Sequence, residues 1–179
     1  MDYLRYYDLE SYLFENVRSN FHEHGRLNAF DFFSIVIWKA NRSKSRIAAR
    51  LLAKGFNDLE AAVTTLTSGI AGQQGRKERL YYLWNDWGFR LPMASAILTV
   101  LYPDDFTIYD YRVCDQLGDF YDLATRSNFE DVWHGYEQLV ARVHAGAPAG
   151  LSLRDKDRYL WGKSIATQLE VDLAARFGK

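Results

Sequence analysis

The chain has 179 residues, of which 48% are hydrophobic and 25% are charged, and its formal net charge is −1. This composition supplies enough apolar side chains for a packed core and excludes a largely disordered chain. A net charge near zero argues against an avid, nonspecific nucleic-acid binder, and no apolar run is long enough to span a membrane.

The length predicts one domain over residues 1–179, with room for two lobes. Residues 1–5 lack the basic and apolar layout of a signal peptide. Cys114 is the sole cysteine, which excludes an internal disulfide and a four-cysteine iron–sulfur cluster and fits a reducing compartment. We therefore expect a cytoplasmic protein with no membrane attachment.

Helical spacing of apolar residues governs the N-terminal part of the chain. Residues 8–20 predict an amphipathic helix, and the run His22-Glu23-His24-Gly25 predicts a turn. Two histidines separated by one residue do not share a helix face, so a solvated turn is favoured there over a metal site. Asn28 is the predicted N-cap of the next helix. This cap, and the absence of a strand to pair with, favour a helix over a buried strand for residues 30–38.

A basic segment follows, because residues 39–54 contain six cations and no acidic residue. These cations are Lys39, Arg42, Lys44, Arg46, Arg50 and Lys54. Ser43 is the predicted N-cap of a helix here, with Gly55 just past its end. Two interpretations stay open for the basic face, namely a solvated helix surface or a surface that binds phosphate.

The next segment predicts three helices and their boundaries. Asn57 and Glu60 form a capping-box pattern, and residues 69–75 predict a loop. A helix beginning near Arg76 should end at Gly88, where a left-handed residue is expected. Pro92 fits the first turn of the following helix, and Pro103 should end that helix.

The last third of the chain predicts helices that begin at Asp110, Asn128 and Ser152. Gly118 should end the first of them, and residues 144–150 predict a flexible connection. Gly162 is expected to break the last helical region into two. The side chains of that region expected to face inward include Tyr159, Ile165, Leu169 and Leu173.

The stretch from Trp87 to Val113 resembles the helix-hairpin-helix superfamily of DNA glycosylases, in its endonuclease III-like and 8-oxoguanine glycosylase-like form. Gly88 falls on the first hairpin glycine, Pro103 on the family proline, and the run Asp110-Tyr111-Arg112-Val113 on the Asp-x-His-apolar segment. The second hairpin glycine is replaced by Arg90, and the position of the Schiff-base lysine is held by Pro92. Together with the helix that begins near Arg76 and the helix from Asp110 to Gly118, the resemblance covers about a quarter of the chain.

The resemblance implies an all-α, two-lobed helical bundle that contains a helix-hairpin-helix motif, with a cleft between the lobes. It implies an enzyme that hydrolyses the N-glycosidic bond of a damaged or modified base in double-stranded DNA. Asp110 would be the catalytic carboxylate, which stabilises positive charge on the sugar as the base leaves. An N-cap role for Asp110 is the alternative, and the two roles are compatible. Pro92 cannot form a Schiff base, so we expect a monofunctional hydrolase.

The residues expected to contact DNA lie in the hairpin, in the basic segment and after Asp110. They are Gly88, Phe89, Arg90, Leu91, Arg112, Lys39, Arg42, Lys44 and Arg46. Tyr109 and Tyr111 flank Asp110 and are the candidates for holding an extruded base. A monovalent cation at the hairpin is the sole cofactor that the resemblance brings in. Two other functions stay open, a non-catalytic nucleic-acid-binding module of the same fold and a helical protein-interaction domain.

Overall fold

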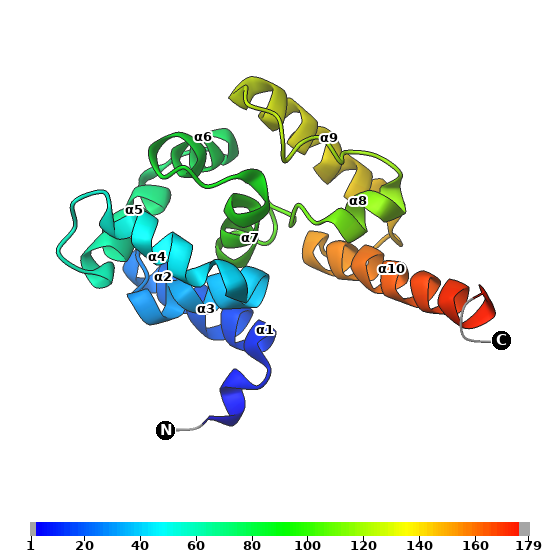
Figure 1. The fold of residues 1–179 in the computed structure, drawn as a ribbon, viewed down its shortest axis with the longest axis horizontal. Coiled ribbons are helices and arrows are strands. Elements are labelled where there is room, and N and C mark those ends of the chain that lie inside the picture. The colour runs from blue at the N-terminus through cyan, green and yellow to red at the C-terminus, as the bar shows by residue number, and fades with distance from the viewer. Residues whose placement is uncertain (1–2, 176–179) are drawn as a thin grey trace. The chain divides into compact units, whose positions relative to one another are not determined.

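The structure is a computed structural model that describes residues 3–175, and these residues form helices and connecting loops with no β-strand (Figure 1). The sequence prediction of an all-α fold is confirmed. In chain order the helices are η1 (Leu4–Tyr6), α1 (Leu9–Ser11), η2 (Tyr12–Val17), α2 (Arg18–His24), α3 (Ala29–Ala40), η3 (Asn41–Ser43), α4 (Lys44–Leu52), α5 (Leu59–Gly72), α6 (Arg76–Tyr81), η4 (Tyr82–Asp86), α7 (Leu91–Leu101), α8 (Tyr111–Leu117), α9 (Phe129–Gly146) and α10 (Leu153–Ala175).

The chain divides into two compact units, Met1–Tyr102 and Pro103–Lys179. The first contains the helices from η1 to α7, and the second contains α8, α9 and α10. The boundary falls just after α7, whose end at Leu101 agrees with the prediction that Pro103 ends this helix. Gly88 and Asp110, which the sequence resemblance places in one site, therefore belong to different units.

The core of the first unit is built around α7. Every residue from Ala94 to Leu101 is buried, because the small side chains at positions 94–96 let neighbouring helices approach closely. Helix α3 packs against α7, and its buried residues include Phe32, Ile35 and Val36. Helix α5 in turn packs against α3 and α4. The choice of helix over strand for residues 30–38 is confirmed, and the Asn28 side chain accepts the backbone N–H of Asp31 at 2.8 Å.

Two predicted caps of the first unit are wrong. Ser43 makes no capping hydrogen bond, because residues 41–43 already form the 3₁₀ turn η3 that leads into α4. Helix α5 is capped by Asp58, whose side chain accepts the backbone N–H of Ala61 at 2.7 Å, and Asn57 lies one residue outside. Glu60 does not complete a capping box, since its carboxylate accepts the backbone N–H of Ala29 at 2.8 Å.

Several helices run further than the sequence predicted. His22 and His24 lie in the last turn of α2, and only Gly25 is left-handed there. Helix α5 continues through Gly69, where a Cβ atom would lie 1.9 Å from the Tyr82 hydroxyl, so the glycine admits a tyrosine side chain from η4. Helix α9 likewise extends to Gly146. A glycine inside a helix costs about 1 kcal/mol relative to alanine, which packing can offset.

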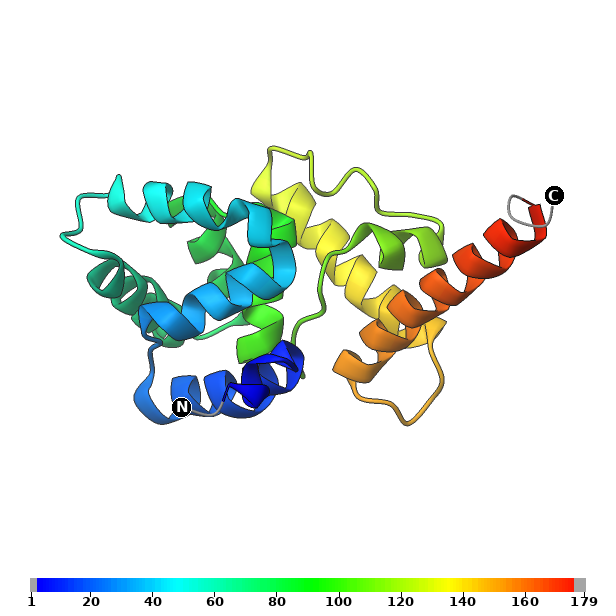
Figure 2. The same ribbon diagram turned by 60° about the horizontal axis from the view of Figure 1, so that its bottom comes forward.

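The second unit packs α10 against α8 and α9 (Figure 2). Its core includes Phe106 and Tyr136, whose rings stack with centroids 6.3 Å apart. The Tyr136 hydroxyl donates to the Thr107 carbonyl at 2.6 Å and accepts the Thr107 N–H at 3.0 Å, so the buried backbone of residue 107 is satisfied by one side chain. The predicted helix starts at Asp110 and Asn128 are confirmed by side-chain capping bonds.

Helix α10 differs most from the sequence prediction. Gly162 does not interrupt it, and the helix is continuous from Leu153 to Ala175. Its inward face consists of Leu153, Asp157, Leu160 and Ser164. The side chains predicted to face inward, Tyr159, Ile165, Leu169 and Leu173, are exposed. The apolar residues predicted the correct helix but the wrong face, because the last buried residue of this helix is Ser164.

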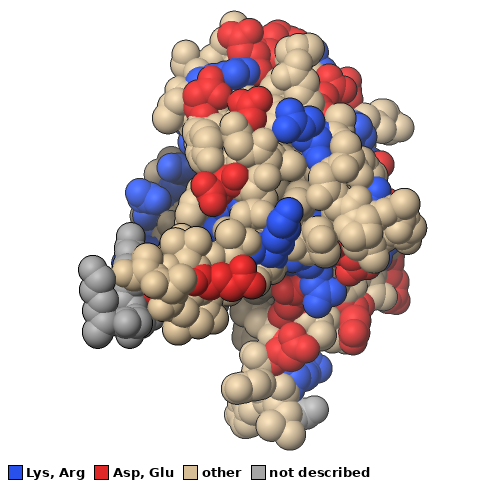
Figure 3. Space-filling model, turned by 90° about the vertical axis from the view of Figure 1, so that its right-hand side faces the viewer, with Lys and Arg blue, Asp and Glu red and all other residues tan. Residues whose placement is uncertain are grey.

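None of the helices within residues 3–175 is both long enough and apolar enough to cross a membrane. On the molecular face drawn in Figure 3, basic and acidic side chains are interspersed among uncharged ones. The net charge of −1 is the balance of 22 basic and 23 acidic residues rather than a lack of charged residues.

Candidate nucleic-acid interface

The basic segment of the first unit forms η3 and α4. Ile47 and Leu51 are buried and fix which face of α4 packs inward. Arg42, Lys44, Arg46, Arg50 and Lys54 are all exposed, and Lys39 at the end of α3 is half-buried. Arg46 and Arg50 are four residues apart, which places them on one side of α4, and Lys54 follows in the turn after the helix.

The turn between η4 and α7 has the left-handed geometry that the sequence predicted for it. Gly88 has φ of +66°, and the buried Phe89 donates its backbone N–H to the Leu83 carbonyl at 2.9 Å. This closure spans one residue more than the usual helix C-cap, because the last turn of the helix is the π-helical segment η4. Pro92 lies in the first turn of α7, as predicted.

The basic helix and this turn meet directly. The Arg50 guanidinium donates from Nη1 to the Gly88 carbonyl at 2.7 Å, across 38 residues of sequence. The Lys54 ammonium lies 5.2 Å from the Trp87 ring centre, and the Arg90 guanidinium lies 4.7 Å from the Trp84 ring centre. We name as the basic surface the residues Arg42, Lys44, Arg46, Arg50, Lys54, Arg90 and the turn at Gly88.

Two of the predicted contact residues contribute no side chain to this surface. Phe89 and Leu91 are buried, and the Phe89 ring packs against Phe32 with centroids 6.3 Å apart. These two positions can reach a ligand only through their backbone. Sequence reasoning did not single out Arg50 as a contact residue, because its link to Gly88 depends on how α4 packs.

Asp110 is placed at the start of α8 in the second unit. Its backbone is extended, and its side chain accepts the Arg112 N–H at 3.0 Å, so the predicted N-cap role is confirmed. The side chain is half-buried. Next to it, Tyr111 is 63% exposed, and the Arg112 guanidinium lies 5.2 Å from the Tyr111 ring centre. The same guanidinium lies 5.9 Å from the Trp161 ring centre, a residue of α10 that sequence reasoning did not select.

Tyr109 does not lie on the surface beside Asp110. Its ring is buried. Its hydroxyl proton is shared between two acceptors, the Phe120 carbonyl at 2.9 Å and the Tyr121 carbonyl at 3.1 Å. Phe120 has φ of +75°, a left-handed conformation that is unfavourable for a bulky residue and that this hydrogen bond helps to hold. Tyr109 therefore anchors the loop after α8, and Tyr111 is the remaining candidate for contact with a base.

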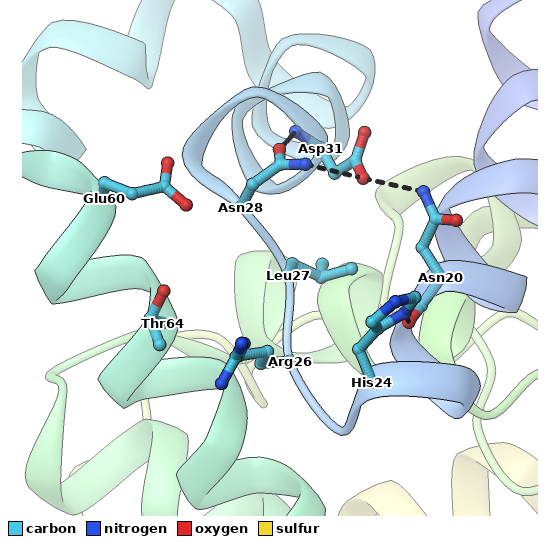
Figure 4. A pocket seen from close by; sticks show the side chains of 8 residues that line it. All are labelled: Asn20, His24, Arg26, Leu27, Asn28, Asp31, Glu60 and Thr64. Atoms are coloured by element: carbon cyan, nitrogen blue, oxygen red, sulfur yellow. Dashed lines mark hydrogen bonds between the residues drawn. The ribbon is translucent and has the colours of Figure 1, made fainter.

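A polar cavity of about 290 Å³ lies in the first unit, near the start of α3 (Figure 4). Asp31 is buried there and accepts hydrogen bonds from the Tyr12 hydroxyl, Asn20 and Asn28. The cavity is lined by Asn20, His24, Arg26, Leu27, Asn28, Asp31, Glu60 and Thr64. Because Asp31 and Glu60 already bond to the chain itself, the network supports the start of α3, and it contains no residue of the predicted site.

The histidine pair considered for metal binding is directed at separate backbone carbonyls. His22 bonds through Nε2 with the Leu101 carbonyl at 2.8 Å, and His24 bonds through Nδ1 with the Asn20 carbonyl at 3.0 Å. Within residues 3–175, no three or more His, Cys, Asp and Glu side chains are grouped so as to hold a metal ion.

The thiol of Cys114 and the hydroxyls of Tyr109 and Tyr12 are buried, and their ionisation should destabilise the protein in alkaline solution. Burial raises the pKa of the Cys114 thiol to about 11 and the pKa of Tyr109 to about 12, and burial with the Asp31 hydrogen bond raises the pKa of Tyr12 to about 12. The folded protein favours the neutral forms, so their contribution is complete below the unfolded pKa values and is lost as pH rises. We expect the free energy of unfolding to fall between pH 9 and 12.

Chemical denaturation at a series of pH values measures this loss. In Cys114→Ala the decline between pH 9 and 11 should become shallower, because the thiol that titrates first is removed. A free energy of unfolding that stays constant from pH 9 to 11 in the unsubstituted protein would contradict the prediction.

Comparison of the chain with protein-family models, curated proteins and solved structures finds no match.

Proposed function

We propose that the protein binds DNA through the basic surface, with the segment from α6 to α7 acting as a helix-hairpin-helix motif. The observation that carries this proposal is the hydrogen bond from Arg50 to the Gly88 carbonyl, which joins the basic helix to the turn. The phosphates of a duplex are negatively charged, so a surface of exposed arginines and lysines is complementary to them in charge.

The basic surface also provides a phosphate contact at the position where the resemblance places a second glycine. Arg90 stands where the resemblance places a second glycine, and its exposed guanidinium can contact a phosphate directly. The Gly88 carbonyl is engaged by Arg50, so the guanidinium supplies positive charge at the turn without a bound cation. A local positive surface can bind phosphate although the whole chain carries a net charge of −1.

Salt dependence tests this proposal. Binding of the unsubstituted protein to a fluorescent duplex of about 20 base pairs should weaken with salt, with a log–log slope of about −0.9 for each phosphate contact. We expect a slope corresponding to several contacts. Absence of binding at low salt, or binding with no salt dependence, would contradict phosphate recognition and favour a protein-interaction domain.

A second function is favoured by the surroundings of Asp110. A carboxylate can stabilise the positive charge that develops on deoxyribose as a base departs, and it can orient the attacking water. Asp110 is half-buried beside the exposed Tyr111, whose ring can stack on a base, and beside Arg112, whose guanidinium can contact phosphate. We therefore propose hydrolysis of the N-glycosidic bond to a modified base, with Asp110 as the catalytic carboxylate.

A panel of duplexes that each carry one modified base tests this second function. Release of a base from any member would support it, and release from none would favour a binding module without chemistry. Because Pro92 stands at the lysine position, borohydride should trap no covalent adduct. An adduct would show that another lysine attacks the sugar.

A further inference from the structure

From Trp161 onward, α10 has a stripe of large, partly exposed apolar side chains, the first of which lies beside Arg112 of α8. Trp161, Ile165 and Leu169 are 47%, 37% and 53% exposed, and they recur every four residues, so they lie along one side of the helix. The inward face of α10 ends at Ser164. Figure 2 shows the later turns of α10 extending past α8 and α9. Single exposed apolar residues are ordinary, but a contiguous row marks a contact surface.

Charged residues lie at both ends of this stripe and carry opposite signs. Arg158 is seven residues before Ile165 and Asp172 is seven residues after it, which places both on the same side of the helix as Ile165. Arg158 pairs with Asp155 at 3.2 Å in an exposed contact. An exposed pair of this kind contributes little to stability, and it leaves the guanidinium at the surface of the helix. Gly162, at the edge of the stripe, has open space where a Cβ would be, which leaves room for a close neighbour.

We propose that a second copy of this chain covers the stripe, with the two α10 helices antiparallel and Ile165 of each copy at the two-fold axis. Antiparallel packing about Ile165 places Trp161 of one copy against Leu169 of the other. It places Arg158 against Asp172 at both ends of the contact. The surface is self-complementary, so the contact closes as a dimer and leaves no free stripe.

The charges at the two ends of the stripe favour an antiparallel over a parallel pair of α10 helices, and they favour a second copy of this chain as the partner. A parallel pair in register would place Arg158 against Arg158 and Asp172 against Asp172, which is repulsive. The stripe from Arg158 to Asp172 covers about four helical turns, or roughly 20 Å. A contact between two helices over so short a length should bury less than the roughly 1,200–2,000 Å² of a stable interface, so the dimer should dissociate on dilution.

Sedimentation equilibrium of the full chain over a wide range of concentrations tests the dimer. The unsubstituted protein should show a monomer–dimer equilibrium, and Ile165→Asp should raise the dissociation constant at least about 10-fold, because it places two carboxylates at the axis. Val171→Asp is the matched control, since Val171 is exposed on another side of the same helix. It adds the same charge and should leave association unchanged. Thermal unfolding followed by circular dichroism checks that both variants fold.

Charge reversal tests the orientation. Arg158→Asp alone and Asp172→Arg alone should each weaken association several-fold, and the double variant should restore it, because each copy again presents opposite charges to the other. In a parallel pair Arg158→Asp would exchange one like-charge contact for another and would not weaken association. A protein that stays monomeric at every concentration, an equal effect of Val171→Asp, or failure of the double variant to restore association would overturn the proposal.

Discussion

Substitution of Arg42, Arg46 and Arg90 together by glutamine should lower the affinity for duplex DNA on the order of 10²-fold at moderate salt. All three side chains are exposed, two on the basic helix segment and one on the turn after Gly88. If each contacts one phosphate, the triple variant should also reduce the slope of log affinity against log salt by about 0.9 per contact. Fluorescence anisotropy titrations at several salt concentrations measure both quantities.

The matched control removes the same charge elsewhere. Substitution of Arg142, Lys156 and Lys163 by glutamine neutralises three cations in the second unit and changes the net charge of the chain by the same amount. If only net charge matters, the two triple variants will weaken binding equally, and the assignment of the basic surface would then fail. A large loss confined to the first triple variant supports contacts at defined positions.

Arg50 requires a separate variant, because its side chain both bonds to the Gly88 carbonyl of the turn and adds positive charge to the basic surface. Arg50→Lys keeps a positive charge but exchanges the planar guanidinium that bonds to the Gly88 carbonyl for a single ammonium. Comparison of this variant with Arg50→Gln separates the orientation of the turn from simple phosphate attraction.

Local signals in the sequence predicted the helix boundaries nearest to the candidate site. Gly88 supplies a positive φ, Pro92 lacks the N–H that the first helical turn leaves unpaired, and Asp110 caps α8 with its carboxylate. Each of these properties belongs to one residue and its immediate neighbours. They could therefore be inferred without knowledge of tertiary packing.

Features that depend on contacts between distant residues could not be predicted in this way. The buried Tyr109 hydroxyl forms hydrogen bonds with the carbonyls of residues 120 and 121. The hydrogen bond from Arg50 to Gly88 joins residues that are 38 positions apart. The buried face of α10 includes no residue after Ser164. The spacing of apolar residues along a helix does not show where such packing ends. In each case the local pattern allowed two environments, and tertiary packing selected one.

Asp110→Asn should strongly slow base release without destabilising the fold, if the proposed excision chemistry is correct. Asparagine caps helices about as well as aspartate, so the hydrogen bond to the Arg112 N–H at the start of α8 is retained. The negative charge that would stabilise the sugar cation is removed, and we expect a decrease in the release rate on the order of 10²–10³-fold. Single-turnover assays on the responsive duplex measure the rate, and chemical denaturation measures the stability.

Two further variants separate catalysis from capping. Asp110→Ala removes both the charge and the cap, so it should lose activity and also about 1 kcal/mol of stability. Asp58→Asn makes the same chemical change at the N-cap of α5, in the other unit, and should leave the release rate unchanged. If Asp110→Asn releases the base at the unsubstituted rate, the carboxylate is a cap alone, and the acid or electrostatic group of any excision reaction must be sought elsewhere in the chain.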